Sequence, residues 1–553
     1  MLRDKALRIL GVGALCLGGM VAAPRTAAAF CGFYVSGGEA KLYNNATVVV
    51  LMRDGTRTVL SMQNNYQGPP TEFAMVVPVP VVLQKADVRT LPREVFDRVD
   101  QLGAPRLVEY WELDPCEGGG DMEAFAVGGL GLVGTGRGGG GTGEGTLGVK
   151  VEAKFTVGEY EVVVLSAKDS TGLDTWLRAN KYNIPAGAEE SLRPYVAAGM
   201  KFFVAKVDPK KVSFDEQGRT MLSPLRFHYD SEQFSLPVRL GLINSAGDQD
   251  LLVNILAKQR HEVANYPNVF IPTNVEVKEG VRSRFGEFYV SLFDAVLKQT
   301  PNAVVTEYAW QANNCDPCPD QPLTLKELVT LGADVLPSYQ QRISGGERGL
   351  QRSMPGEFVL TRLHARYTKE SLGEDLVFRA AEAIVGGRED NTGGGLLAAA
   401  HHPKDAAANR LLQKATSAPI NNFQARYIIR HPWTGKVECK NPAFGYWGGP
   451  PNGKAEEKPV PARGLAFASR AGAIAIDVAH DVPAAGIVAA EPITRRDSRT
   501  EPIRRPPKVE ELPVLEAEVK PAGCGCRSEP APAGAAGLLM LMWLFAPTRR
   551  RRC

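Results

Sequence analysis

Two β-branched runs near the N-terminus most constrain the fold of this chain. Residues 46–52 read ATVVVLM and residues 57–63 read RTVLSMQ, with the turn signal RDGT between them. Asp-Gly between two such runs is typical of a hairpin, because glycine tolerates the positive φ that primed turns require. A third run, residues 71–80, contains Pro78 and Pro80, which cannot donate to a ladder. It therefore predicts a strand that ends there or lies at a sheet edge.

Helix and strand patterns then alternate irregularly along the chain. This predicts an α+β fold, a β-rich mixed body with interleaved helices, rather than a regular parallel βαβ layout. Helices are predicted over 91–102, 172–180, 189–198, 287–298 and 323–331. Strands are predicted over 107–113, 160–165, 201–207, 222–229, 236–243, 250–257, 303–310, 358–367 and 376–379.

Residues 117–148 form a glycine-rich insertion in this pattern. Gly134, Gly136 and Gly139 have the G-x-G-x-x-G spacing of dinucleotide sites, but no strand leads into them and no helix follows. The segment is predicted to be a flexible loop.

The N-terminal 29 residues have the organisation of a signal peptide. Basic residues precede an apolar run over 9–23, and three alanines at 27–29 suit a signal peptidase, with Phe30 as the first mature residue. An uncleaved anchor is disfavoured because the apolar run is short for a membrane span. A lipoprotein signal is disfavoured because bulky residues directly precede Cys16 and Cys31.

Charge and length set further bounds. The chain has 64 basic and 61 acidic residues, a formal charge of +3, so its overall field does not indicate a nucleic-acid partner. Its 553 residues allow two to four domains.

The cysteine count depends on export. Removal of the leader leaves Cys31, Cys116, Cys315, Cys318 and Cys439 in the body. In an oxidising compartment these are expected to form bridges, and an odd number leaves at least one thiol free or paired elsewhere. Cys439 is predicted to pair with Cys31 or with Cys116.

The Cys315-Asp316-Pro317-Cys318 motif has three interpretations. A redox pair is typically placed at a helix N-terminus, whereas Cys315 follows a predicted strand. A zinc site needs two further ligands, and His261 and His364 are distant in sequence. A structural disulfide is therefore favoured over a redox pair, and a redox pair over a metal site.

Other catalytic patterns are missing from the sequence. It contains no G-x-S-x-G elbow, no H-E-x-x-H helix and no Walker A lysine, and we predict no cofactor and no metal site. His228 is expected to be a half-buried packing residue. The adjacent His401 and His402 would point apart on a helix, which disfavours a shared metal. Trp433 and the aromatic run over 444–447 are expected to pack on a core or edge, with a carbohydrate platform as the alternative.

Four stretches together carry a resemblance to a known family. They read MQNNYQGPPTEFAMVVPVP over 62–80, YEVVVLSAKDSTGLDTWLRANKYNIP over 160–185, LSPLRFHYDSEQFSLPVRLG over 222–241 and NNCDPCPD over 313–320. The residues of these stretches and their order along the chain resemble the bacterial domain-of-unknown-function family 2330. The resemblance extends roughly from Cys31 to Arg388. The resemblance implies an exported or membrane-attached bacterial protein, and it brings no known activity or catalytic residue.

The pattern loosens after this body, which we assign to residues 30–390. Residues 391–449 are expected to be an appended segment, with an alanine-rich helix over 396–416 and a strand over 424–431. Residues 450–523 are rich in Pro, Ala and charged residues, and they contain few large apolar side chains to offset the entropy of ordering. They are predicted to be a disordered linker.

Residues 524–553 have the organisation of a sorting tail. The apolar run AGAAGLLMLMWLFA over 533–546 would measure about 21 Å as a helix, short of the roughly 30 Å of bilayer hydrocarbon. It is preceded by Cys524 and Cys526 and followed by the stop cluster Arg549, Arg550, Arg551 and Arg552. The tail is similar to the myxobacterial C-terminal sorting tail. The resemblance implies Cys524 or Cys526 as the lipid-modification or processing site, and a sorting protease as a partner beside signal peptidase. A permanent membrane anchor is the alternative, and Cys553 has no assigned role.

These features predict an exported, C-terminally anchored cell-surface protein with a structural, binding or adhesive role. The alternative is an exported enzyme, either a CxxC thiol-disulfide oxidoreductase or a hydrolase whose site is assembled from distant residues.

Overall fold

A computed structural model describes most of the body of the chain. The described residues are 33–36, 43–67, 73–116, 148–180, 182, 184, 187–214, 220–244, 248–316, 318–346, 349–387, 413–440, 442, 444, 447–448, 460–462 and 474–492. The predicted signal peptide, nearly all of the glycine-rich insertion, the predicted helix up to residue 412 and the sorting tail lie outside these ranges. All of the described residues belong to one compact unit.

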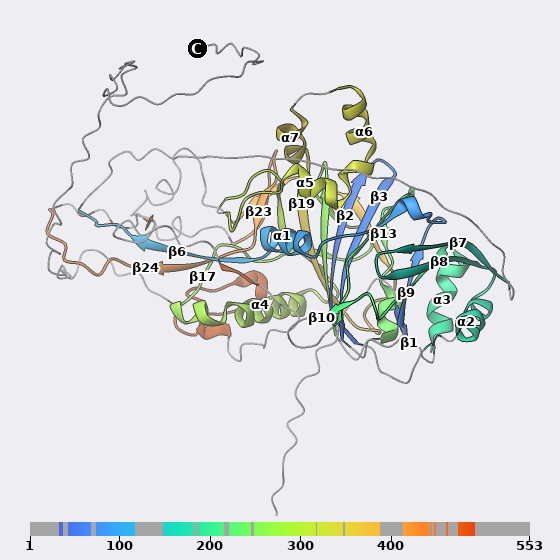
Figure 1. The fold of residues 1–553 in the computed structure, drawn as a ribbon. Coiled ribbons are helices and arrows are strands. Elements are labelled where there is room, and N and C mark those ends of the chain that lie inside the picture. The colour runs from blue at the N-terminus through green and yellow to red at the C-terminus, as the bar shows by residue number, and fades with distance from the viewer. Residues whose placement is uncertain are drawn as a thin grey trace, which may run out of the picture. The chain divides into compact units, whose positions relative to one another are not determined.

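The fold is α+β, as predicted, and its centre is a large mixed sheet (Figure 1). The order is β22-β21-β23-β18-β19-β14-β2-β3-β12-β5, with β16 beside β18. The bounds are β22 (Thr416–Ser417), β21 (Ile384–Gly386), β23 (Asn422–Gln424), β18 (Val304–Gln311), β19 (Val359–Tyr367), β14 (Gln249–Ala257), β2 (Tyr43–Asp54), β3 (Arg57–Gln67), β12 (Leu225–Asp230), β5 (Val88–Thr90) and β16 (Asn268–Phe270).

The predicted hairpin is at the centre of this sheet. β2 and β3 pair antiparallel, and Asp54 faces Arg57 across a turn in which Gly55 has φ +60°. A side chain at this φ would be strained, which explains the glycine. β14 pairs in parallel with β2. These strands lie some 200 residues apart in the chain, so no local sequence pattern predicts their pairing.

A second sheet of five strands packs against the large one. Its order is β1-β4-β9-β8-β7. The bounds are β1 (Phe33–Ser36), β4 (Phe73–Val79), β9 (Lys201–Val207), β8 (Tyr160–Ala167) and β7 (Val149–Val157). The proline-containing β4 lies inside this sheet, but β1 pairs with it only as far as Val76, so Pro78 has a ladder partner on one side alone.

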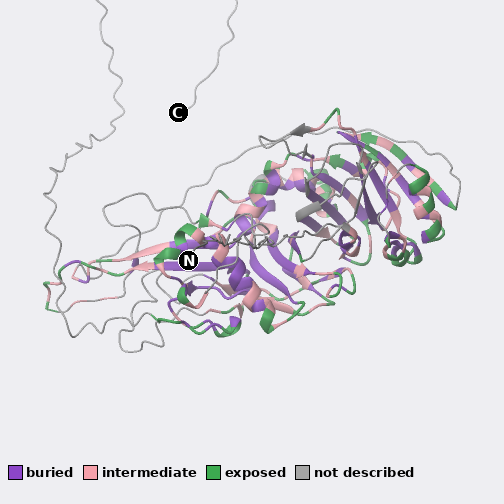
Figure 2. Cartoon of the chain, turned by 90° about the horizontal axis from the view of Figure 1, so that it is seen from below, coloured by how far each residue is buried: buried purple, intermediate pink, exposed green. Residues whose placement is uncertain are grey.

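The body has four layers, which are a pair of helices, the five-stranded sheet, the large sheet and the helices on its outer face. Successive side chains of a strand point to opposite faces of its sheet, so each sheet contributes to two cores. Along β9, Phe203 and Ala205 face the core between the two sheets, whereas Phe202 and Val204 face two helices, α2 (Ser170–Ala179) and α3 (Ala188–Ala197). On the large sheet, Val49 contributes to the core between the sheets. Figure 2 shows how the buried residues concentrate in the strands.

The outer face of the large sheet is covered by further helices. The hydrophobic core between this face and the helices combines residues of β2, β3, β18 and β19 with residues of α1 and α5. A separate core lies between α4 and β24, which are neighbours in Figure 1. The bounds are α1 (Glu94–Gly103), α4 (Phe285–Gln299), α5 (Leu325–Leu331), α6 (Pro337–Ser344) and α7 (Leu350–Ser353).

Smaller sheets complete the described part. One has the order β17-β24-β6-β25 with β26 also on β6, one has β13-β20-β15, and β10 pairs with β11. The bounds are β17 (Val275–Glu276), β24 (Arg426–His431), β6 (Arg106–Glu112), β25 (Trp447–Gly448), β26 (Val460–Pro461), β13 (Ser235–Leu236), β20 (Leu376–Ala380), β15 (His261–Val263), β10 (Ser213–Phe214) and β11 (Thr220–Met221).

The strand predicted over 236–243 is wrong. Only Ser235–Leu236 is a strand, and residues Arg239–Asn244 form a 3-10 helix. The Asp375 carboxylate accepts hydrogen bonds from the backbone N–H groups of Val238 and Arg239, at 2.8 and 3.1 Å. These donors are therefore taken by a distant side chain instead of by a neighbouring strand.

The predicted appended segment and linker are partly wrong as well. β23 and β24, after residue 420, are strands of the body's own sheets. In the predicted linker, β26 pairs with β6, and residues 474–492 pack on α4 with Val478 and Val482 fully buried. Composition misjudged this segment because small apolar residues bury their surface on a helix that is already formed, without a core of their own.

Candidate functional site

The CxxC motif is closed as a disulfide. Cys315 and Cys318 are bridged, with an S–S distance of 2.05 Å, in the loop between β18 and α5. Cys318 is exposed and Cys315 is half-buried. The N-cap of α5 is Thr324, well beyond the motif, so the pair does not have the helix N-terminal placement of thioredoxin-like sites.

Hydrogen bonds hold the loop of this disulfide to the sheet. The buried Gln424 side chain on β23 donates to the carbonyl oxygens of Asp316 and Gly387. Trp310 on β18 donates from Nε1 to Asn314 Oδ1 at 2.5 Å. These contacts favour the structural interpretation of the bridge over the redox one.

A second disulfide joins Cys116 to Cys439. The sequence left Cys31 and Cys116 open as partners of Cys439, and the structure selects Cys116. Cys116 follows β6 and Cys439 follows β24, and these strands pair in parallel, so the bridge closes the end of the pair. Cys31 lies outside the described residues.

A network of buried charges crosses the outer face of the large sheet, and the sequence analysis missed it. Three basic residues alternate on β19, where Arg362, His364 and Arg366 share one face because side chains repeat every two residues. The stretch VLTRLHARY carries this signal as three basic residues at every second position of an otherwise mostly apolar strand.

The network alternates acids and bases. Arg362 contacts Asp100 of α1 at 2.5 Å and Glu307 at 2.7 Å. His364 lies between two carboxylates, with Nδ1 2.7 Å from Glu307 Oε1 and Nε2 2.9 Å from Asp250 Oδ1. Arg366 then binds Asp250 through two hydrogen bonds of 2.8 and 3.0 Å and also pairs with Asp294 of α4. We call these seven residues, Asp100, Asp250, Asp294, Glu307, Arg362, His364 and Arg366, the buried charge network.

A β-bulge places Glu307 at the centre of the network. On β18, Thr306 pairs with Leu363 and Tyr308 with Arg362, so Glu307 is the extra residue. Bulges re-aim the side chain of the extra residue. Glu307 is fully buried and also accepts a hydrogen bond from Tyr289 of α4.

The charges of the network shift its pKa values. Burial alone would raise the pKa of Glu307, but the charges of His364 and Arg362 outweigh burial and lower it to about 2. Burial likewise opposes ionisation of Asp250, but His364 and Arg366 lower its pKa to about 2. Burial would lower the pKa of His364, but Glu307 and Asp250 raise it above its usual value.

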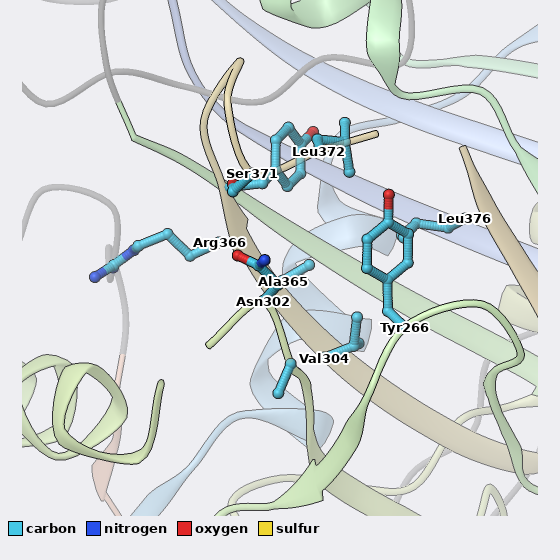
Figure 3. Close-up of a pocket in the computed structure, with 10 residues that line it drawn as sticks. Tyr266, Asn302, Val304, Ala365, Arg366, Ser371, Leu372 and Leu376 are labelled. Atoms are coloured by element: carbon cyan, nitrogen blue, oxygen red, sulfur yellow. The ribbon is translucent and has the colours of Figure 1, made fainter. Parts of the chain in front are cut away.

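One small pocket lies beside the network. This pocket, next to β19 and lined by Tyr266, Asn302 and Leu372 among others, has a volume of only about 10 Å³, close to that of one water site (Figure 3). Arg366 belongs to its lining, but its side chain extends away from the other labelled residues. Both nitrogens of His364 are already hydrogen-bonded, which leaves neither free to act as a general base on a ligand.

The remaining histidines of interest are dispersed. His228 lies 3.5 Å from Asp87, His261 is buried in β15, and His431 binds Glu109 at 2.8 Å and stacks on Trp111. Across the described residues, no group of three or more His, Cys, Asp or Glu side chains is arranged to hold a metal ion. His401 and His402 lie outside the described part.

The sorting-tail residues also lie outside the described part, namely Cys524, Cys526 and the arginines at 549–552. Within the described ranges, no helix combines the length and apolar character needed to cross a membrane.

Comparison with known proteins identifies a family and nothing more. No curated protein and no solved structure matches the chain significantly. A family model does match residues 25–379, more than half of the chain. The chain therefore belongs to the family described as uncharacterized proteins conserved in bacteria, DUF2330.

Proposed function

We propose that this chain is an exported protein, attached to the cell surface through its C-terminal tail, whose body serves a structural, binding or adhesive role. The observation that carries the proposal is the pair of disulfides, Cys116–Cys439 and Cys315–Cys318. Disulfides persist in oxidising compartments and are rare in reducing ones. The bridges therefore agree with the signal-peptide pattern of residues 1–29 and with export.

The tail supplies the second part of the proposal. An apolar run shorter than the bilayer, followed by four arginines, would hold the exported chain at the membrane while a sorting protease acts. Cys524 or Cys526 would then carry a lipid at the new C-terminus. Residues 493–523, between the last described residue and this motif, leave a segment that can separate the body from the membrane.

Mass spectrometry of the protein recovered from its native cell envelope tests the proposal. We expect an N-terminus at Phe30, a C-terminus near Cys524 or Cys526, and added acyl mass on that peptide. Recovery of an intact tail through Cys553 would make it a permanent anchor instead of a processed signal. Recovery from the cytosol with residues 1–29 intact would overturn export.

Matched variants separate the two tail elements. Replacing Cys524 and Cys526 together with serine should abolish the acyl mass, and replacing the four terminal arginines with glutamine should reduce surface retention. Replacing Arg379, an exposed arginine of the body, is the control and should change neither.

A thiol-disulfide oxidoreductase is the second candidate function, because Cys318 is exposed and open to attack by an external thiolate. The test is reduction of a protein disulfide by the chain in the presence of a dithiol, compared with a Cys318→Ser variant. A rate equal for both chains excludes this activity, and a rate that depends on Cys318 establishes it.

A further inference from the structure

The position of His364 demands a particular protonation state. Its two ring nitrogens lie 2.7 Å from Glu307 and 2.9 Å from Asp250, and both carboxylates are nearly or fully buried. A neutral imidazole has one N–H and can donate to only one of them. The imidazolium donates to both, so each of the two short contacts becomes a charge-assisted hydrogen bond.

The surrounding charges also favour the imidazolium. Charged and titratable groups from several elements interact with His364 or with its partners. They are Asp100 of α1, Arg106 of β6, Asp248 and Asp250 at β14, Tyr289 and Asp294 of α4, Glu307 of β18, Arg362 and Arg366 of β19, and Tyr427 of β24. Asp248 is exposed to solvent, whereas Arg106 and Arg362 are fully buried. Within the buried charge network, four carboxylates face only two guanidinium groups, so carboxylates are in excess and the proton on His364 supplies a third positive charge.

Helix α4 depends on this network for its contacts with β19. Phe293 stacks on the His364 ring, with centroids 3.9 Å apart and planes 20° apart. Tyr289, one helical turn earlier, donates to Glu307, and Asp294 pairs with Arg366. The side of α4 that meets β19 is thus bound to groups whose geometry requires a charged His364.

We propose that protonated His364 stabilises the packing of α4 on the large sheet, and that this packing loosens when His364 loses its proton. One ring nitrogen of neutral His364 would present a lone pair to a buried carboxylate, either Glu307 or Asp250. The repulsion between the lone pair and this carboxylate would weaken the contacts that hold α4. Residues 474–492 pack on α4, so they should loosen with it.

The direction of the pH dependence follows from the raised pKa of His364. Burial opposes the charge, but Glu307 and Asp250 outweigh burial and raise the pKa above 6.5. The stabilisation is therefore complete below about pH 6.5 and is lost as the pH rises toward the folded-state pKa. Between these two values the equilibrium constant for the closed state should fall about tenfold per pH unit.

Hydrogen exchange of the full chain from pH 5.5 to 9.5 tests whether α4 loosens when His364 loses its proton. After correction for intrinsic exchange rates, amides of α4 should exchange up to about tenfold faster per pH unit between pH 6.5 and the folded-state pKa of His364, and no faster above it. Amides of α2, which packs in a different core, should stay constant. A constant rate in α4, or an equal rise in both helices, would overturn the proposal.

NMR of histidine-¹⁵N-labelled protein measures the proton directly. The His364 signals should show both ring nitrogens protonated at pH 6, because the pKa of His364 is raised above 6.5. A neutral tautomer at pH 6 would overturn the proposal even if α4 loosens for another reason.

Two variants test the proposal, so that it does not depend on whether one substituted protein folds. His364→Gln should make exchange in α4 fast and independent of pH. If this variant does not fold, Asp294→Asn removes a partly exposed acceptor and should loosen α4 while the pH slope remains. His228→Gln is the matched control, because His228 also lies near a carboxylate, that of Asp87, but on β12 and outside the network, and this variant should keep the wild-type profile. Loss of the pH slope in the control would assign the effect to another histidine.

Discussion

Glu307 shows how much a single residue contributes when it is the extra residue of a bulge. Its carboxylate is fully buried and accepts hydrogen bonds from Arg362, His364 and Tyr289. A buried carboxylate is tolerated only when it is paired and hydrogen-bonded. The sequence pattern VVTEYAW indicates a strand, but it does not indicate that Glu307 leaves the two-residue alternation. That information requires the register against β19.

Replacing Glu307 with glutamine should therefore destabilise the body strongly. The variant leaves the buried Arg362 and His364 without their shared counter-charge, and breaking such a buried pair costs about 3–5 kcal/mol. Denaturant titration should show a lower midpoint at an unchanged slope. Glu161→Gln, at an exposed position of β8, is the control and should change the free energy of unfolding by less than about 0.5 kcal/mol. Equal effects in both variants would contradict a stabilising role of the network.

The elements of the body follow the sequence closely where their pattern is long and regular. The predicted strand over 201–207 matches β9, and the predictions over 358–367 and 287–298 match β19 and α4 within two residues. Failures occur where an element depends on a distant partner. The strand predicted over 236–243 is lost to Asp375, and 474–492 is ordered by α4.

The docked segment 474–492 offers a test at this scale. Val478 is fully buried against α4, whereas Val488 is 73% exposed. Val478→Ala should lower the free energy of unfolding by about 2 kcal/mol, because two buried methyl groups are removed. Val488→Ala should have almost no effect, and thermal unfolding of both variants measures the difference. Equal melting temperatures would mean that the segment does not stabilise the body.

Across the whole molecule, the body is a four-layer arrangement that strands from distant segments complete. β14 lies beside β2, and β24 lies beside β6, each pair in parallel. The Cys116–Cys439 bridge spans 323 residues, whereas Cys315–Cys318 spans three. The two bridges therefore constrain the unfolded chain very differently.

Removal of the bridges should reveal this difference. In the chain-entropy account, replacing Cys116 and Cys439 with serine should cost roughly 5 kcal/mol, because a loop of hundreds of residues is released. Replacing Cys315 and Cys318 should cost less than about 2 kcal/mol, because their loop is short. Denaturant titrations of the two double variants under oxidising conditions make the comparison. A larger loss for the short bridge would mean that native contacts of the 315–318 loop dominate its contribution.

The sequence by itself determined the α+β class, the central hairpin and most of the long strands and helices, because these depend on local periodicity and turn chemistry. It also carried the terminal patterns from which export and surface attachment are proposed. Only the tertiary structure decided the sheet order, the partner of Cys439, the docking of 474–492 and the buried charge network. Each of these joins residues far apart in the chain, and the stability of such a contact depends on burial and register, which local sequence does not encode.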